Sequence, residues 1–458
     1  MRRRKSVQLF LLSMFLFSMV ACSSKKEESV EKDSPEQNAY DSIKPGFGDS
    51  DLMYYFNYEN VIAEIIEEIG DYDTFDLLNV TSLNNGNYLV TIVANWDSLV
   101  FVQLDQFGSI VTQNFFKDVC HDFGCSGEEA LPVEVVLTID RVVFFVFAGS
   151  HNPIIIFDRN NGNHIKETAD IIINDSGVTY FGESVIVGSN IYTYTRERLC
   201  CDTPMSRENS KTNFIKVNAN TGEIEWQAII RAGVSNPDLF TTGGIQLSEN
   251  GEYIYIYGIL YENFKDFEEF DYIEDRMEQD AAYYDNLRSS KLMIAKYSLE
   301  GYFLSRVLYE DDDYVYFLTN KDSNGSDLFY TVNYKNTCPE GTGYNDEACY
   351  YDLTTTVKIY SADKESISEI ITEEFDISKS EDIINYSISF IYGNTLYRFN
   401  EKEILSLNLE NEEISKTSMP KITKTATYVK YYIEDGNLYL VLIDWKKEHI
   451  GLVRVPLQ

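Results

Sequence analysis

The sequence is poor in the residues on which most catalytic and metal sites depend. Only four histidines occur among 458 residues, and none has the spacing to another that metal ligands usually show: His121, His151, His164 and His449. No Gly-x-Ser-x-Gly turn or phosphate loop is present. We therefore predict no catalytic residue, no metal site and no bound cofactor, although active sites assembled from distant loops leave no such motif.

Basic residues are also scarce. The chain has 38 Lys and Arg against 74 Asp and Glu, which gives a formal net charge of -36. Such a surface repels the phosphates of nucleic acids, so we expect no nucleic-acid partner. Prolines number nine, whereas 34 Tyr and 27 Phe occur in runs separated by Asn, Gly and Asp. This pattern predicts an all-β protein.

One long apolar run is present, from Val7 to Val20, and it follows the basic residues Arg2 to Lys5. The run is shorter than the roughly 20 residues that span a bilayer. The small residue Ala21 then precedes Cys22. Residues 1–21 therefore read as a secretory signal peptide rather than a permanent membrane helix.

Residues 19–22, Met-Val-Ala-Cys, resemble the lipobox of bacterial lipoproteins, with Met19 in the place of the commonest Leu. This resemblance implies that the chain is cut before Cys22, that Cys22 carries the lipid, and that acyl chains hold the protein on a membrane. An ordinary signal peptide with a chance cysteine is the alternative. Cleavage would remove four basic residues and change the formal charge to -40.

Residues 22–48 are polar and rich in Ser and Glu, so we expect a disordered tether. Within it, Lys26-Glu27-Glu28 resembles the short export signal of surface lipoproteins in Bacteroidota. We expect a lipid-anchored protein of the cell envelope, at the outer membrane, with the leaflet left open.

Six cysteines remain once Cys22 is assigned to lipid, an even number that suits an oxidising compartment. Short loops favour three local disulfides among the fifteen possible pairings: Cys120 with Cys125, Cys200 with Cys201, and Cys338 with Cys349. Free structural thiols are the alternative.

A strand followed by a polar turn recurs along the chain. Copies lie at residues 101–108, 154–162, 214–222, 294–301, 357–363, 405–410 and 452–456. Asp, Asn or Ser can accept backbone hydrogen bonds in such a turn, and Gly or Asn can take the positive φ. The spacing is typical of β-propeller blades, each a four-stranded sheet.

The third copy resembles the repeat of quinoprotein-like propellers in Asn218, Thr221, Gly222 and Trp226. We therefore predict a propeller over residues 49–458, with seven blades that begin near residues 75, 134, 177, 243, 314, 384 and 426. Six or eight blades stay open. Residues 52–58 are expected to supply the missing fourth strand of the last blade, and residues 61–69 a short helix.

Three long insertions fall between second and third strands, near residues 195–212, 262–290 and 334–355. Because that connection always lies on one face of a propeller, the insertions should share a rim, where binding usually resides. We expect a non-catalytic binding or scaffolding module with an envelope protein or extracellular ligand as partner. The alternative is a secreted hydrolase, lyase or quinoprotein-like dehydrogenase with its site at the central channel.

Overall fold

Every described element of the chain is a β-strand, as the alternation of apolar and polar residues predicts. The computed structural model describes residues 51–57, 75–94, 98–106, 108–116, 133–146, 153–168, 178–198, 212–230, 239–262, 290–309, 315–319, 328–336, 353–362, 367–376, 388–393, 395–399, 403–408, 411, 413–418, 427–434, 436–444 and 449–457. All of them belong to one compact unit, Pro45–Gln458. The helix predicted over residues 61–69 lies outside these ranges.

The described strands form seven antiparallel sheets of four strands each, and six of these sheets use four strands that are consecutive in sequence. Blade 1 holds β2 (Phe75–Ser82), β3 (Tyr88–Ala94), β4 (Ser98–Leu104) and β5 (Ile110–Phe116). Blade 2 holds β6 (Val133–Leu137), β7 (Arg141–Val146), β8 (Ile154–Asp158) and β9 (His164–Glu167). Blade 3 holds β10 (Val178–Val187), β11 (Asn190–Arg198), β12 (Thr212–Asn218) and β13 (Ile224–Ile229).

The next three blades have the same order. Blade 4 holds β14 (Leu239–Leu247), β15 (Tyr253–Tyr261), β16 (Ser290–Ser298) and β17 (Phe303–Tyr309). Blade 5 holds β18 (Val315–Thr319), β19 (Leu328–Asn336), β20 (Leu353–Ala362) and β21 (Ile367–Asp376). Blade 6 holds β22 (Ile388–Tyr392), β23 (Thr395–Phe399), β24 (Glu403–Asn408) and β25 (Ile414–Ser418).

The remaining sheet combines the two ends of the described chain. It holds β26 (Thr427–Glu434), β27 (Asn437–Asp444), β28 (His449–Pro456) and β1 (Asp51–Asn57), and we call it the closing blade. β1 pairs antiparallel with β28, with Asp51 opposite Arg454 and Asn57 opposite His449. The prediction that residues near 52–58 complete the last blade is therefore confirmed.

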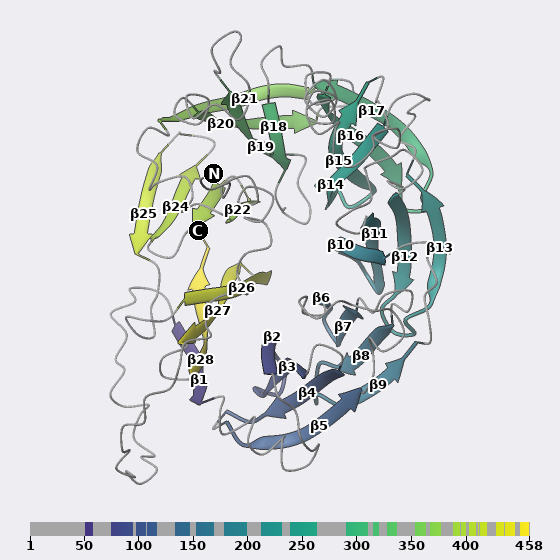
Figure 1. The fold of residues 1–458 in the computed structure, drawn as a ribbon, viewed down its shortest axis with the longest axis vertical. Helices are drawn as coiled ribbons and strands as arrows, with labels where there is room; N and C mark the ends of the chain where they lie inside the picture. The colour runs from purple at the N-terminus through teal and green to yellow at the C-terminus, as the bar shows by residue number, and fades with distance from the viewer. Residues whose placement is uncertain are drawn as a thin grey trace, which may run out of the picture. The chain divides into compact units, whose positions relative to one another are not determined.

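Neighbouring blades pack through apolar side chains and close a ring. Val80 and Val90 of blade 1 lie in one cluster with Val441 of the closing blade. Further clusters join blade 1 to blade 2, blade 2 to blade 3, blade 3 to blade 4, and blade 6 to the closing blade. Blade 5 contacts its neighbours through β15 against β18 and through β19 against β22. The first strand of each blade lies toward the centre of the ring and the fourth toward its rim (Figure 1). This arrangement is a β-propeller.

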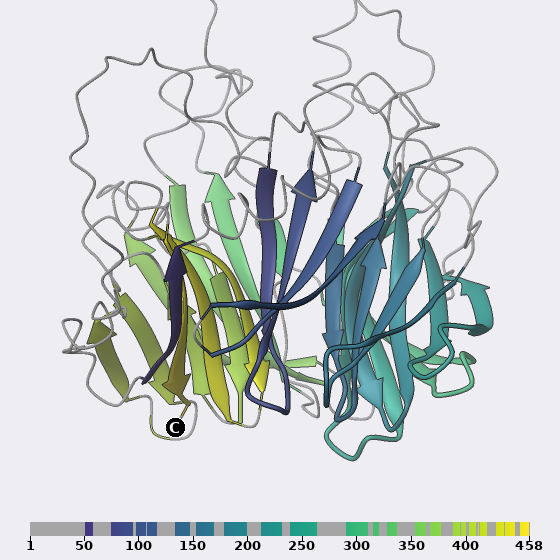
Figure 2. The same cartoon turned by 90° about the horizontal axis from the view of Figure 1, so that it is seen from below.

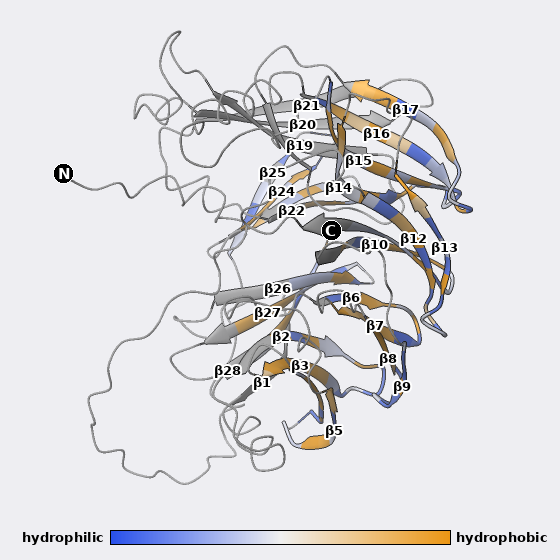
Figure 3. Ribbon diagram, turned by 45° about the vertical axis from the view of Figure 1, so that its right-hand side comes forward, coloured by the Kyte–Doolittle hydropathy of each residue, from blue (hydrophilic) through white to orange (hydrophobic). Residues whose placement is uncertain are grey.

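The middle strands of a blade supply most of the core. Every residue of β3 and β4 is buried, whereas the outer β5 is mostly half-buried. Hydrophobic colour runs along middle strands such as β7 and β16, and hydrophilic colour marks many of the turns (Figure 3). Outer strands are therefore edges that face solvent, as expected for a ring whose blades pack face to face.

The ring has two different faces. Connections between first and second strands, and between third and fourth strands, lie on one face, which we call the turn face. Connections between second and third strands, and between successive blades, lie on the other, which we call the insertion face. The side view shows the described tight turns and the C-terminus together at its lower edge (Figure 2). The insertion face receives the residues that separate β11 from β12, β15 from β16, and β19 from β20.

Candidate functional site

The polar turn between third and fourth strands recurs on the turn face. Its first residue accepts a backbone hydrogen bond through its side chain: Asn160 N donates to Asp158 Oδ1 at 2.8 Å, and Asn220 N donates to Asn218 Oδ1 at 2.9 Å. The glycine of each turn has positive φ, 76° at Gly162 and 68° at Gly222. The predicted chemistry of this turn is confirmed, because Asp and Asn satisfy the turn amides while Gly takes the left-handed conformation.

The four residues of the quinoprotein-like motif have structural contacts in blade 3. Asn218 Oδ1 also accepts from Thr221 N at 3.3 Å, and Gly222 N donates to the Asn218 carbonyl at 2.8 Å. Trp226, in β13, packs on the next blade: a Cβ added to Gly301 would lie 2.8 Å from its ring. Gly301 therefore provides the flat surface that receives the Trp226 indole.

Trp226 belongs to an aromatic cluster between blades 3 and 4. Its ring centroid lies 4.9 Å from that of Phe214, in an edge-to-face arrangement. Phe214 in turn contacts Tyr297 of blade 4 at 5.4 Å. Edge-to-face pairs of this kind add to the apolar burial. Trp226 therefore packs blade 3 against blade 4, whereas the bonds of Asn218 and Thr221 hold their own turn.

A charged pair lies beside this cluster. Lys216 Nζ is 2.6 Å from Glu225 Oε2, and the Lys216 ammonium lies 5.8 Å from the centroid of the Tyr192 ring. The hydrogen bond to Glu225 raises the pKa of Lys216, and the same bond together with one from Asn218 lowers the pKa of Glu225. Burial raises the pKa of Tyr192, and the Lys216 charge opposes that rise. All three groups therefore keep their neutral-pH forms, and the pair supports the interface.

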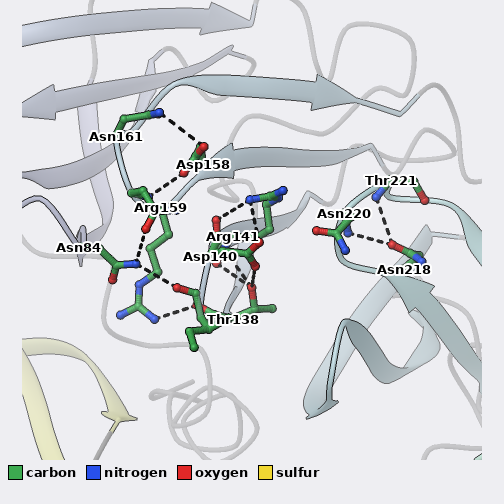
Figure 4. Close-up of polar contacts among 12 residues, drawn as sticks. Asn84, Thr138, Asp140, Arg141, Asp158, Arg159, Asn161, Asn218, Asn220 and Thr221 are labelled. Atoms are coloured by element: carbon green, nitrogen blue, oxygen red, sulfur yellow. Dashed lines mark hydrogen bonds and ion pairs between the residues drawn. The ribbon is translucent and has the colours of Figure 1, made fainter.

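A second polar network joins blades 1 and 2 on the turn face (Figure 4). Asn84 N donates to the Arg159 carbonyl at 2.9 Å, and Asn84 Nδ2 donates to the Ile139 carbonyl and to Asn160 Oδ1, each at 2.9 Å. Arg159 N donates to the Asp140 carbonyl at 3.0 Å. The network therefore ties the first turn of blade 1 to both turns of blade 2.

The Arg159 side chain extends this network across the ring. Its guanidinium donates to the Thr138 carbonyl at 2.8 Å and to Glu434 Oε2 at 2.6 Å. A further contact joins its Nη1 to Glu434 Oε1, so the carboxylate is held at both oxygens. The side chains are 8% and 19% exposed. Because Glu434 ends β26, this ion pair connects blade 2 directly to the closing blade, past blade 1.

Sequence reasoning missed this pair. In the sequence, Arg159 is one residue of a polar turn and Glu434 is one of many acidic residues. The sequence carries one modest signal of the pair. Arg159 directly follows the first residue of its turn, at the position where the other clear copies have Gln106 and Ala219. A long cationic side chain at that position can reach the neighbouring turns, but its partner is set by ring closure.

Metal-ligand clusters and membrane-spanning helices can be assessed only in the part of the chain that the structure describes. No group of three or more His, Cys, Asp or Glu side chains there is arranged to hold a metal ion. Within the same ranges no helix has the length and apolar character to cross a bilayer.

The predicted lipid-attachment and disulfide residues lie outside the described ranges: Cys22, Cys120, Cys125, Cys200, Cys201, Cys338 and Cys349. The strands that flank four of them are described. Residues 199–211 connect β11 to β12, and residues 337–352 connect β19 to β20. Four of the cysteines therefore belong to connections on the insertion face.

No protein-family profile and no curated sequence matches the chain. Solved structures resemble it in fold. A polysaccharide lyase, Uly1, is 10% identical with a TM-score of 0.50, over 83% of this chain and 89% of that chain. The Pan2 WD40 domain of Neurospora crassa is 9% identical with a TM-score of 0.46, over 89% and 96%. The quinohemoprotein alcohol dehydrogenase ADHIIG from Pseudomonas putida HK5 is 10% identical with a TM-score of 0.39, over 89% and 77%. At such identities the likeness to the lyase shows the β-propeller fold alone.

Proposed function

We propose that this chain is a lipid-anchored β-propeller of the bacterial cell envelope, at the outer membrane, that binds a protein or other extracellular ligand without catalysis. The observation that carries the proposal is the contrast between the two faces. Three consecutive blades, 3, 4 and 5, have long connections between their second and third strands, and all of these connections leave the insertion face. Loops supported by a rigid scaffold on one face are where binding residues usually lie.

The described contacts of the turn face support this assignment. Arg159, Asn84 and Trp226 are engaged with neighbouring blades, so their polar and aromatic groups serve the ring. Ligand recognition is then left to the insertion face. The acidic composition favours a basic or neutral partner over a polyanion.

The register of the blades allows each insertion to be removed cleanly. Tyr261 pairs with Ser290, and Asn336 pairs with Leu353, so the strand ends on each side of an insertion are adjacent. Replacing residues 262–289, or residues 337–352, with Asn-Gly should close a two-residue hairpin and leave the blade intact.

The test is affinity capture of envelope proteins and glycans with the full mature chain. The excised variants should lose a captured partner, and purified partner should then bind the parent chain but not these variants. The matched control, Glu249→Gln with Glu252→Gln, changes a turn of the opposite face and should bind as the parent does. Equal capture by all variants, or turnover of a polysaccharide or alcohol substrate by the pure protein, would contradict the proposal.

Anchorage has its own test. Metabolic labelling with an alkyne fatty acid should mark the protein in bacteria, and Cys22→Ala should abolish the label and release the protein from the membrane fraction. A labelled or membrane-bound Cys22→Ala protein would refute attachment at Cys22.

A further inference from the structure

The register between β1 and β28 shows on which face of the ring β1 begins. Asp51 lies opposite Arg454, near the end of β28, whereas Asn57 lies opposite His449, where β28 starts. β1 therefore begins on the face at which β28 ends.

That face is the turn face. Just beyond β28, Leu457 N donates to the carbonyl of Gly436, at 2.8 Å, in the turn between β26 and β27. In blade 3 the corresponding bond runs from Ala219 N to the Ser189 carbonyl, also at 2.8 Å, between its two tight turns. The β28 end and the β1 start thus occupy the place of the third-to-fourth-strand turn of an ordinary blade. The purple β1 rises from the edge that carries the C-terminus in Figure 2.

The segment between Cys22 and Asp51 joins the ring at this point. We infer that the turn face is the face of the propeller nearest the membrane and that the insertion face points away from it. This inference rests on the proposed anchorage at Cys22. The composition of this segment predicts a coil, and a coil of that length has a root-mean-square end-to-end distance of about 30 Å, short enough to keep the attachment side of the ring toward the bilayer.

The negative charge of the chain strengthens the preference for this orientation. Without residues 1–21 the chain has a formal charge of -40, so an anionic bilayer repels the whole ring. Exposed acids of the turn face, such as Glu223, Glu249 and Glu413, oppose adsorption of that face. Such repulsion keeps the rim and the insertion face from adsorbing on the bilayer, so the attachment point alone sets the orientation. Because such repulsion is screened within about 10 Å at 0.1 M salt, the orientation should be sharper at low ionic strength.

This orientation determines the side from which a partner approaches. A ligand of the insertion face approaches from the aqueous compartment, on the side of the ring opposite the anchoring bilayer. The geometry therefore favours a soluble or extended partner over a protein embedded in the same membrane beside the anchor.

The test compares two dye positions in one hairpin. Asn220 is exposed in the turn of blade 3, and Ile229 is 49% exposed at the far end of β13, opposite Asn213 of the insertion face. An azide-bearing amino acid at either site accepts a donor dye, and vesicles carry an acceptor on the lipid headgroup. A hexahistidine tag in place of Cys22 holds the chain on nickel-chelating lipid, so the orientation is measured independently of natural lipidation.

Since β13 has six residues and spans about 20 Å, energy transfer should be roughly twofold higher from Asn220 than from Ile229. Deleting residues 30–44 to shorten the tether should increase that ratio, and so should anionic lipid at low salt. A ratio near one with the short tether, or a higher transfer from Ile229, would overturn the inferred orientation. Absence of the fatty-acid label from the parent chain, together with an intact ratio, would instead refute only the anchorage.

Discussion

The guanidinium of Arg159 in blade 2 and the carboxylate of Glu434 in the closing blade form a mostly buried ion pair that bypasses blade 1. The Thr138 carbonyl accepts a further guanidinium bond. The pair joins a continuous blade to the composite one, so it stabilises closure rather than a single sheet. A mostly buried charge that loses its partner is costly, whereas the intact pair is roughly balanced by its desolvation.

Glu434→Gln should therefore lower the free energy of unfolding by about 2–3 kcal/mol, because Arg159 then keeps its charge without a counterion. The measurement is urea unfolding followed by fluorescence. Glu223→Gln is the control: its oxygen lies 4.0 Å from Lys166 Nζ, and the side chains are 72% and 42% exposed. That exposed pair should contribute less than about 0.5 kcal/mol. Equal losses in both variants would contradict a role of the Arg159–Glu434 pair in closure.

Gly301→Ala tests the contact of the Trp226 indole with the next blade. Gly301 has φ of 83°, and a Cβ there would lie 2.8 Å from the ring, so conformational strain and steric overlap add together. We expect a loss of about 2–4 kcal/mol. Gly251→Ala is the matched control, since its φ of 69° is similar but its Cβ would enter open space. It should cost about 1 kcal/mol, and an equal cost at both sites would show that packing on Trp226 is unimportant.

Tyr432→Phe should make the protein more resistant to alkali. Burial raises the pKa of the Tyr432 hydroxyl far above its usual value, and Ser82 Oγ lies 3.4 Å away. The folded pKa exceeds the unfolded one, so this stabilisation is complete below about pH 10 and is lost as the pH rises, by up to about 1.4 kcal/mol per unit. The Phe variant lacks that loss.

Urea midpoints at pH 8.5 and pH 11 measure this effect, and the parent should fall further between them than Tyr432→Phe does. Tyr302→Phe, at a side chain that is 71% exposed, is the control and should follow the parent. Parallel losses in the parent and in Tyr432→Phe would show that the Tyr432 hydroxyl does not limit alkaline stability.

Removal of β1 should leave the ring open. A chain that begins at residue 59 lacks the strand that pairs with β28, so β28 becomes an unpaired edge. We expect a lower urea midpoint and concentration-dependent self-association by light scattering. A chain that begins at residue 49 is the control and should stay monomeric. Identical behaviour of the two chains would mean that the β1–β28 ladder contributes nothing to closure.

The sequence predicted the repeat better than the contacts between repeats. The polar turns at Asp158 and Asn218 are local signals, since a few adjacent residues determine the turn, and the third strands lie where the repeat placed them. The closing strand was also predictable, because a final blade that stops at a third strand requires a fourth. The Arg159–Glu434 pair was not, since its residues are 275 positions apart and only the assembled ring brings them together. The motif residue Trp226 was identified, yet its contact with Gly301 depends on how two blades are stacked.

The pairing of β1 with β28 also governs the timing of folding. β1 leaves the ribosome before any other described strand, yet its partner β28 is made last among them. The ring cannot close before β28 has been made, and β1 has no partner strand until then. Contacts between such distant segments form slowly. The interval between the synthesis of β1 and that of β28 is therefore the stage at which this protein is most prone to aggregate.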